Sequence, residues 1–269
     1  MYNTPPPYKP QRISWNNNAS KLLELIHETR ESYSKKGLVH VLKTGFFMMI
    51  EYFQLLFYKI FRNKETFELN GKRYKYFFHP RIAKTGPSWK NERSVSIPII
   101  WEIIKEYRSK GKNVLELGNV LSYTFKIDHD VIDKYEMMDG VINEDIISFA
   151  PKKKYDLIVS VLSFQCVGWD ESPQDPPKIV KAIENMKEIL VPGGKIFMAI
   201  GWGWNQYLDK LILDGKFHLD KQLYLKKDKG YHWKEVPSLT DIKNLEYDNK
   251  MHTATGIIIA TIEKKENEK

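Results

Sequence analysis

Residues 114–118, Val-Leu-Glu-Leu-Gly, are a short and largely apolar run that ends in a glycine. Its length and lack of alternation are typical of a strand that is buried on both faces of a parallel sheet. Ligands of such sheets bind beyond the carboxyl ends of the strands, and a glycine there lets the main chain approach a ligand closely. Gly118 therefore marks a turn at which a ligand could bind, although an ordinary structural turn explains the same residue.

Strand-like and helix-like segments alternate around this run from about residue 92 onward. Strands rich in Val, Ile and Leu are expected at 113–117, 130–134, 140–143, 155–162, 195–200 and 256–262, and helices at 97–107 and 178–190. Pro98 is expected near the start of the first helix, and Pro192-Gly193-Gly194 predict a tight reversal between the second helix and the strand after it. The alternation predicts an α/β domain with a parallel sheet.

The sequence around Gly118 lacks the motifs that hold phosphates. The chain has no G-x-G-x-x-G and no Gly-Lys-Ser/Thr, and residues 119–129 are too short for a long helix whose first turn could bind a pyrophosphate. These observations point away from NAD and ATP. They leave room for an adenosyl group with an amino-acid tail, which needs no phosphate site.

Acidic residues follow the next two expected strands. Asp133 comes 15 residues after Gly118, with Glu136 close by, and Asp145 follows the third strand. A carboxylate at the end of the second strand can accept hydrogen bonds from both hydroxyls of a ribose. Each acid could instead be a surface residue, and Asp145 could be the N-cap of a short turn.

Five segments in this order, VLELGN, VIDKYE, INEDI, YDLIVS and LVPGGKIFMAI, together resemble the class I S-adenosylmethionine-dependent methyltransferases. The resemblance covers about residues 92–265. It implies a Rossmann-like seven-stranded sheet with helices on both faces, preceded here by an N-terminal helical extension and a β-hairpin. The segments TFELNGKRYKYFFHP, WKNERSVSIPI and GNVLS also resemble a bacterial and archaeal subgroup that is associated with surface glycan synthesis.

The resemblance implies roles for matching positions, and S-adenosylmethionine is the cofactor that it implies. Glu116 and Gly118 would flank its methionine part, and Asn119 would line it. Asp133, or alternatively Glu136, would hold the ribose. Asp145 would contact the adenine. Ser160, Leu162 and Ser163 would lie beneath the sulfonium and the acceptor.

Two departures from the family's pattern bear on catalysis. The familiar Gly-x-Gly-x-Gly is reduced to Gly118, and Gln165-Cys166 stand where related small-molecule methyltransferases often have Glu-His. A base must then lie elsewhere, or activity is altered or lost. The candidate catalytic residues are Asp170, Glu171 and His79, with His232 as a further histidine. Each acid could be a solvated loop residue, and each histidine could be structural. The indoles of Trp202 and Trp204 could stack on a sugar or belong to the core.

The first third of the chain differs from the rest in charge. Residues 1–91 hold 16 Lys and Arg against 6 Asp and Glu, a balance of +10, whereas residues 92–269 hold 26 against 28, a balance of −2. Two helices are expected over about 18–62, the second from Gly45 to Phe61, and Asn70-Gly71 predict a hairpin over 65–79. We therefore divide the chain into an extension, 1–91, which is a lid or a membrane-surface contact, and a methyltransferase domain, 92–269.

The function expected from these observations is O-methylation of a sugar or another small hydroxylated acceptor. An RNA methyltransferase and a non-catalytic scaffold with a methyltransferase fold remain alternatives. With Cys166 as its only cysteine, the chain has no internal disulfide, and no metal site is expected. We expect a cytoplasmic protein whose residues 45–64 could contact the inner face of the membrane, although a helix packed on the main domain explains the same pattern. Nucleic acid is a less favoured partner for the basic residues in the first third of the chain.

Overall fold

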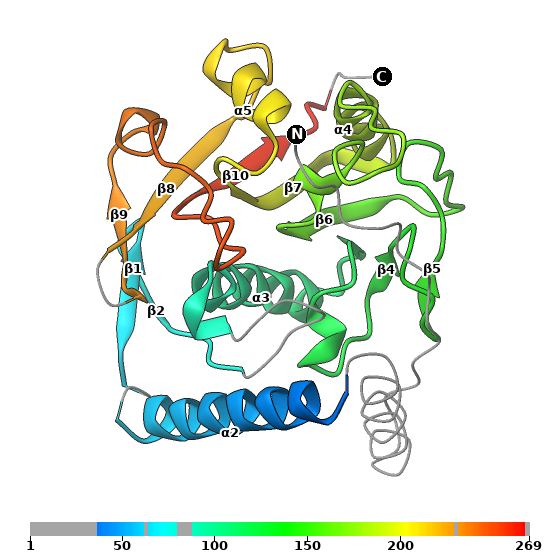
Figure 1. Ribbon diagram of the computed structural model, residues 1–269. Helices are drawn as coiled ribbons and strands as arrows, with labels where there is room; N and C mark the ends of the chain where they lie inside the picture. The colour runs from blue at the N-terminus through cyan, green and yellow to red at the C-terminus, as the bar shows by residue number, and fades with distance from the viewer. Residues whose placement is uncertain (1–36, 62–63, 80–87, 229–230, 267–269) are drawn as a thin grey trace.

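The computed structural model describes residues 37–61, 64–79, 88–228 and 231–266 (Figure 1). The helix expected before Gly37 lies outside these residues. The main sheet consists of β3 (Val114–Leu117), β4 (Asp130–Ile132), β5 (Val141–Ile142), β6 (Tyr155–Val161), β7 (Leu190–Gly201), β8 (Lys221–Lys227), β9 (Trp233–Val236) and β10 (Gly256–Glu263). A separate hairpin contains β1 (Thr66–Leu69) and β2 (Lys72–Lys75).

The strand order of the main sheet is β5-β4-β3-β6-β7-β10-β8-β9. The first five strands in this order run parallel, and β10 lies antiparallel to both of its neighbours. This is the Rossmann-like arrangement of a methyltransferase sheet, as expected. The described sheet has eight strands rather than the predicted seven, because β9 adds to the edge of β8.

Helices cover both faces of the sheet, as the alternation predicted. On one face α3 (Arg93–Ser109) packs on Val114 and Val159 in an apolar cluster that also includes Phe67 and Leu69 of the hairpin. On the other face α4 (Lys178–Glu188) and α5 (Gln206–Leu213) form a second cluster. The hairpin therefore shares a core with the sheet (Figure 1).

The helix α3 begins four residues earlier than predicted, which places Pro98 inside the helix rather than near its start. A proline has no N–H to donate to the carbonyl four residues before it, which here belongs to Ser94. The backbone N–H of Phe77 donates to that carbonyl oxygen at 2.9 Å instead. The chain that leaves the hairpin thus satisfies the carbonyl that the proline leaves open.

The turn predicted at Pro192-Gly193-Gly194 lies inside β7, which begins at Leu190, and not before the strand. Between Leu190 and Lys195 the pairing with β6 advances by only two residues, and Gly193 has a φ of 73°. Gly193 donates to the carbonyl of Lys264 at 2.8 Å, and the N–H of Lys264 donates to Gly194 at 2.9 Å. The sequence analysis also missed β8, β9 and α5, since lysines interrupt the apolar pattern of β8 and β9 is short.

The N-terminal elements are the hairpin and α2 (Leu38–Phe61). The hairpin turn at Asn70-Gly71 is confirmed, with φ angles of 51° and 72° that suit a two-residue turn. The helix begins seven residues before the predicted Gly45. It lies along one edge of the described body (Figure 1), where the buried Leu55 and the stacking of Tyr58 on Trp89 hold it.

Candidate active site

The main chain turns sharply at Gly118, directly beyond the carboxyl end of β3. Its φ of +83° favours glycine, and its N–H donates to the carbonyl of Ile132, the last residue of β4, at 2.8 Å. A Cβ atom at this position would lie 2.1 Å from the Oγ of Ser163, which follows β6. The turn therefore brings together the ends of three strands.

Asp133 stands immediately after β4 and is fixed by three backbone groups. Its Oδ2 accepts from the N–H of Asn119 at 3.1 Å, and its Oδ1 accepts from the N–H groups of Tyr135 and Glu136, each at 2.9 Å. A carboxylate has about four acceptor positions, so capacity for a further donor remains. The structure thus places Asp133 beside the Gly118 turn and orients it.

Asn119 and Glu136 contact each other across the same turn. The Nδ2 of Asn119 donates to Oε1 of Glu136 at 2.9 Å, and the hydroxyl of Tyr123 donates to the same oxygen. The hydroxyl of Ser122 donates to Oδ1 of Asn119. The structure therefore joins Gly118, Asn119, Asp133 and Glu136 into one group, which we call the Gly118 group.

Glu116 is held by the loop that follows Gly118 and by His129. Its side chain is fully buried, and its Oε1 accepts from the N–H groups of Val120 and Leu121, each at 2.9 Å. Its Oε2 lies 3.0 Å from Nε2 of the equally buried His129. A carboxylate enclosed in this way shapes the loop after Gly118, and the role of Glu116 beside the methionine part of a cofactor stays a prediction.

Four charged side chains form a network beside the Gly118 group. Lys178 is only 6% exposed, and its Nζ lies 2.5 Å from Asp145 and 2.7 Å from Glu171. Lys134 pairs with the same two carboxylates at 2.9 and 3.0 Å. Partial burial alone would raise the pKa of Asp145 and that of Glu171, but the hydrogen bonds from Lys178 and Lys134 lower both. A lowered pKa makes a carboxylate a weaker proton acceptor, so Glu171 is the less favoured of the two acid candidates.

Ser160 and Leu162 lie at the end of β6, below the Gly118 turn. The hydroxyl of Ser160 is fully buried; it donates to the carbonyl of Leu117 at 3.2 Å and accepts from the N–H of Phe164 at 2.9 Å. This serine therefore joins β3 to the loop after β6. Leu162 has a φ of +61°, which is uncommon for a residue other than glycine, and such strained positions concentrate at functional sites.

A second polar group lies farther along the loop after β6. The carboxylate of Asp170 accepts from Nε1 of Trp204 at 3.2 Å, and the ring of Trp204 lies 4.7 Å from that of Tyr247. Cys166 and Arg93 interact electrostatically within the same group, Cys166 with both Asp170 and Arg93. We call Arg93, Cys166, Asp170, Trp204 and Tyr247 the Asp170 group.

The Asp170 group holds its titratable side chains at perturbed pKa values. Burial raises the pKa of Asp170, although hydrogen bonds with Cys166 and Trp204 act in the opposite direction. Burial, together with the charge of Asp170, raises the pKa of the Cys166 thiol well above its usual value. Burial lowers the pKa of Arg93, which still carries its charge at neutral pH. A carboxyl with a raised pKa is a better proton acceptor than an ordinary surface acid.

Gln165 and Trp202 have structural positions next to the Asp170 group. The Oε1 of Gln165 accepts from the N–H of Gly201 at 2.5 Å, and its carbonyl accepts from Nδ2 of Asn205, the N-cap of α5, at 2.8 Å. Trp202 is buried and donates to the carbonyl of Lys243 at 3.2 Å. Of the two tryptophans singled out in the sequence, only Trp204 belongs to the Asp170 group.

In the described part of the chain, no hydrogen bond or ion pair joins His79 or His232 to Asp170 or Glu171. The ring of His79 lies parallel to that of Phe77 at 6.1 Å, and the backbone N–H of His79 donates to the hydroxyl of Ser88 at 2.7 Å. His232 lies 3.4 Å from Glu65. The sequence analysis missed Arg93, Lys178 and Tyr247, because nothing in the local pattern distinguishes them from the many other basic and aromatic residues.

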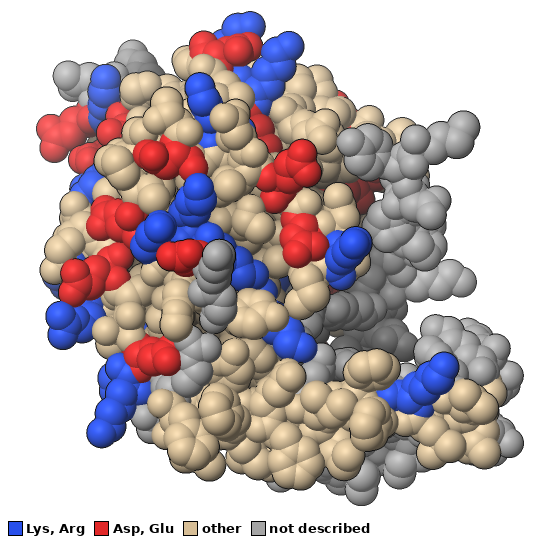
Figure 2. Space-filling view, turned by 60° about the vertical axis from the view of Figure 1, so that its left-hand side comes forward, with Lys and Arg blue, Asp and Glu red and all other residues tan. Residues whose placement is uncertain are grey.

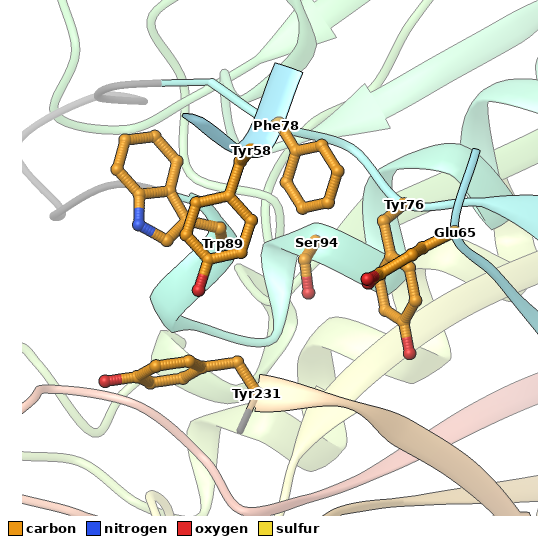
Figure 3. A pocket seen from close by; sticks show the side chains of 7 residues that line it. All are labelled: Tyr58, Glu65, Tyr76, Phe78, Trp89, Ser94 and Tyr231. Carbon is orange, nitrogen blue, oxygen red and sulfur yellow. The ribbon is translucent and has the colours of Figure 1, made fainter. Parts of the chain in front are cut away.

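A small aromatic recess lies near the start of α3 (Figure 3). Its lining consists of Tyr58, Glu65, Tyr76, Phe78, Trp89, Ser94 and Tyr231. In Figure 3 the rings of Tyr58 and Trp89 face each other, Tyr231 lies on the opposite side, and the hydroxyl of Ser94 points into the space between them. Because Ser94 follows Arg93, the recess lies close along the chain to the Asp170 group.

Comparison with known proteins finds no matching protein family and no matching curated protein. Among solved structures, the chain is similar to the N-methyltransferase NodS from Bradyrhizobium japonicum WM9, with 17% identity, a TM-score of 0.37, and coverage of 61% of this chain and 93% of that one. An S-adenosylmethionine-dependent methyltransferase from Clostridium acetobutylicum is 14% identical, with a TM-score of 0.29 and coverage of 59% and 88%. Because these likenesses are distant, the functional argument depends on the strand order and on the two residue groups.

Proposed function

We propose that this protein is an S-adenosylmethionine-dependent methyltransferase that binds its cofactor at the Gly118 group. The observation that carries the proposal is the juxtaposition of Gly118 and Asp133 at the carboxyl ends of β3 and β4. A glycine turn with no side chain and an oriented carboxylate with acceptor capacity fit the amino-acid tail and the ribose of the cofactor. Asn119 and Glu136 belong to the same proposed cofactor site.

The residues fit the adenosyl part less completely. Asp145, expected at the adenine, is engaged with Lys134 and Lys178. With three donors at about four acceptor positions, Asp145 can accept one further hydrogen bond from the adenine amino group beside the two lysines. When bound, S-adenosylmethionine supplies an electrophilic methyl group, and the protein contributes the positioning of the acceptor.

We assign acceptor binding to the Asp170 group. Trp204 and Tyr247 offer aromatic surface of the kind on which a sugar ring stacks, and the guanidinium of Arg93 offers hydrogen-bond donors to hydroxyl groups. Asp170 is the candidate general base that holds the proton of an acceptor hydroxyl. We therefore favour O-methylation of a sugar or another small hydroxylated compound.

Cofactor binding is tested by calorimetry with S-adenosylhomocysteine. We expect binding by the native protein and at least about tenfold weaker binding by Asp133→Asn, since one acceptor oxygen becomes a donor. The matched control is Asp214→Asn at the C-cap of α5, an exposed site that should leave affinity unchanged. Absence of any binding heat or thermal shift with the native protein would refute the proposal.

Catalysis is tested by product mass after incubation with a panel of glycans and nucleotide sugars. With an acceptor found, Asp170→Asn should lower kcat by about 10²-fold or more while S-adenosylhomocysteine affinity is retained. The acid limb of the pH–rate profile should disappear in this variant. A profile identical to that of the native protein would remove Asp170 from the role of base.

A non-catalytic protein with the methyltransferase fold is the second candidate. It is favoured by the ion pairs that engage Asp145 and by the backbone groups that already bind Asp133. Calorimetry separates the two candidates, because this second function predicts no affinity for S-adenosylhomocysteine in the native protein.

A further inference from the structure

The outer surface of α2 is apolar where a surface helix is normally polar. Only three of its 24 residues are charged. Its exposed large apolar side chains, each between 49 and 69% exposed, are Leu38, Val39, Leu42, Phe46, Phe47, Met49, Tyr52, Phe53, Phe57, Ile60 and Phe61. In Figure 2 the lower edge of the molecule, where α2 lies, is an almost uninterrupted tan surface.

These side chains lie on one wide face of the helix, which also contains two polar residues, Lys43 and Gln54. At about 100° of rotation per residue, the arc from Tyr52 to Phe47 spans roughly 220° of the helix circumference. Leu55 and Tyr58, which attach the helix to the body, lie on the remaining side. The exposed face is therefore much wider than the narrow seam that a partner helix covers in a coiled coil.

The geometry of α2 suits a plane surface. At 1.5 Å per residue the helix is about 36 Å long. The other labelled elements all lie on one side of it in Figure 1. No helix among the described residues has the length and apolarity needed to cross a bilayer. A helix that is wide-faced, apolar and unable to span can lie in the interface between headgroups and acyl chains.

The charge around α2 indicates the kind of surface. In the described part of residues 1–91, seven Lys and Arg stand against three Glu, a balance of +4, and Lys43 and Lys64 are exposed in and just beyond the helix. Basic residues beside an apolar helix are attracted to anionic headgroups. Such an excess of positive charge would oppose the close approach of the same region in a second copy of the chain.

We propose that α2 docks the protein on an anionic lipid bilayer, lying in the plane of the interface with its apolar face toward the acyl chains. Because Tyr58 also lines the aromatic recess, docking places that recess at the membrane surface. The inference is independent of the proposed methyl transfer.

The test is co-sedimentation of the full chain with vesicles of phosphatidylcholine alone or with one quarter phosphatidylglycerol. We expect binding to the anionic vesicles that weakens as salt rises. The double variant Phe46→Glu/Phe53→Glu should bind at least about tenfold more weakly, because two exposed rings of the docking face become charged. Both positions are exposed, so the variant should keep the native thermal midpoint.

The control variant is Leu213→Glu/Met251→Glu, which charges two exposed apolar residues outside α2 and should bind vesicles as the native protein does. Equal vesicle binding by the α2 variant and the native protein, or no binding by the native protein, overturns the proposal. The proposal is also overturned if the native protein does not bind vesicles but forms a dimer in sedimentation equilibrium that the α2 variant abolishes. Calorimetry with S-adenosylhomocysteine on the same variants tests the proposed cofactor binding separately.

Discussion

Gly118 and Ser163 occupy positions so close that a single methyl group on the glycine would overlap the serine side chain. The added Cβ would lie 2.1 Å from Oγ and 2.2 Å from Cβ of Ser163, but 3.7 Å from its Cα. The overlap therefore involves only side-chain atoms of Ser163, and a second substitution can remove it.

We expect Gly118→Ala to lower the free energy of unfolding by roughly 2–4 kcal/mol, from overlap and from the left-handed backbone. Gly118→Ala/Ser163→Gly should recover the part due to overlap and leave about 1–2 kcal/mol. Gly111→Ala is the control, with a φ of +69° and no atom within 4 Å. Urea unfolding measures all three; a double variant no more stable than Gly118→Ala would contradict this account.

Removal of Lys178 should be among the most damaging single changes at the site. Lys178→Met leaves Asp145 and Glu171 facing each other with only the more exposed Lys134 as partner. We expect a loss of roughly 3–5 kcal/mol at pH 7, measured by urea unfolding. Lys195→Met, which breaks a surface pair with Glu263, should cost about 0–1 kcal/mol.

The ion pairs of Asp145 and Glu171 with the two lysines should make the stability of the fold depend on pH. The pKa values of Asp145 and Glu171 are lowered in the folded protein, so their stabilisation is present above the unfolded pKa and is lost as pH falls through the folded one. Lys178→Met should weaken this acid-side loss. An unfolding profile between pH 3 and pH 6 that is parallel to that of the native protein would contradict the assignment.

The buried Asp209 should make the stability of the fold depend on pH in the opposite direction. Burial raises the pKa of Asp209 to about 7, although the N–H of Gly203 donates to its Oδ2 at 2.9 Å. The folded state then holds a proton that the unfolded state releases, so stability falls as pH rises from about 4 to 7. Asp209→Asn should remove this fall and gain at most roughly 4 kcal/mol above pH 7. Thermal unfolding at pH 5 and pH 8 is the measurement, with Asp214→Asn as the exposed control.

Cys166 should react slowly with iodoacetamide at pH 8. Burial and Asp170 raise the pKa of its thiol, and the thiolate is the reactive form. We expect alkylation in urea to be at least about tenfold faster than in the folded protein. Since the chain has only this cysteine, the mass of the intact protein reports the reaction directly. Equal rates would show that the thiol is neither buried nor influenced by Asp170.

The sequence predicted those parts of the fold that depend on local pattern. The glycine at 118, the Asn70-Gly71 turn and the apolar strands each carry their signal within a few residues, and the structure contains all of them. β8 was not predicted because Lys221, Lys226 and Lys227 interrupt its apolar pattern. Its apolar residues contact β10 only in the folded sheet.

The site was predictable to the extent that position along a strand determines it. Asp133 lies near Gly118 because parallel strands end at one edge of the sheet. The enclosure of Glu116 by Val120, Leu121 and His129 could not be predicted, since a buried carboxylate and a ligand-binding one occupy the same place in the sequence. The pairing of Glu171 with Lys178 likewise depends on the folded loop.

The bond from Phe77 to the carbonyl of Ser94 has a practical consequence for anyone who wishes to shorten the chain. Cutting at residue 92, the boundary suggested by charge and motif, would remove the only donor described for that carbonyl and uncover the apolar surface that Phe67 and Leu69 protect. The smallest fragment expected to remain soluble and folded therefore begins before Thr66 and keeps the hairpin. Removal of α2 alone, by contrast, would leave that interface intact.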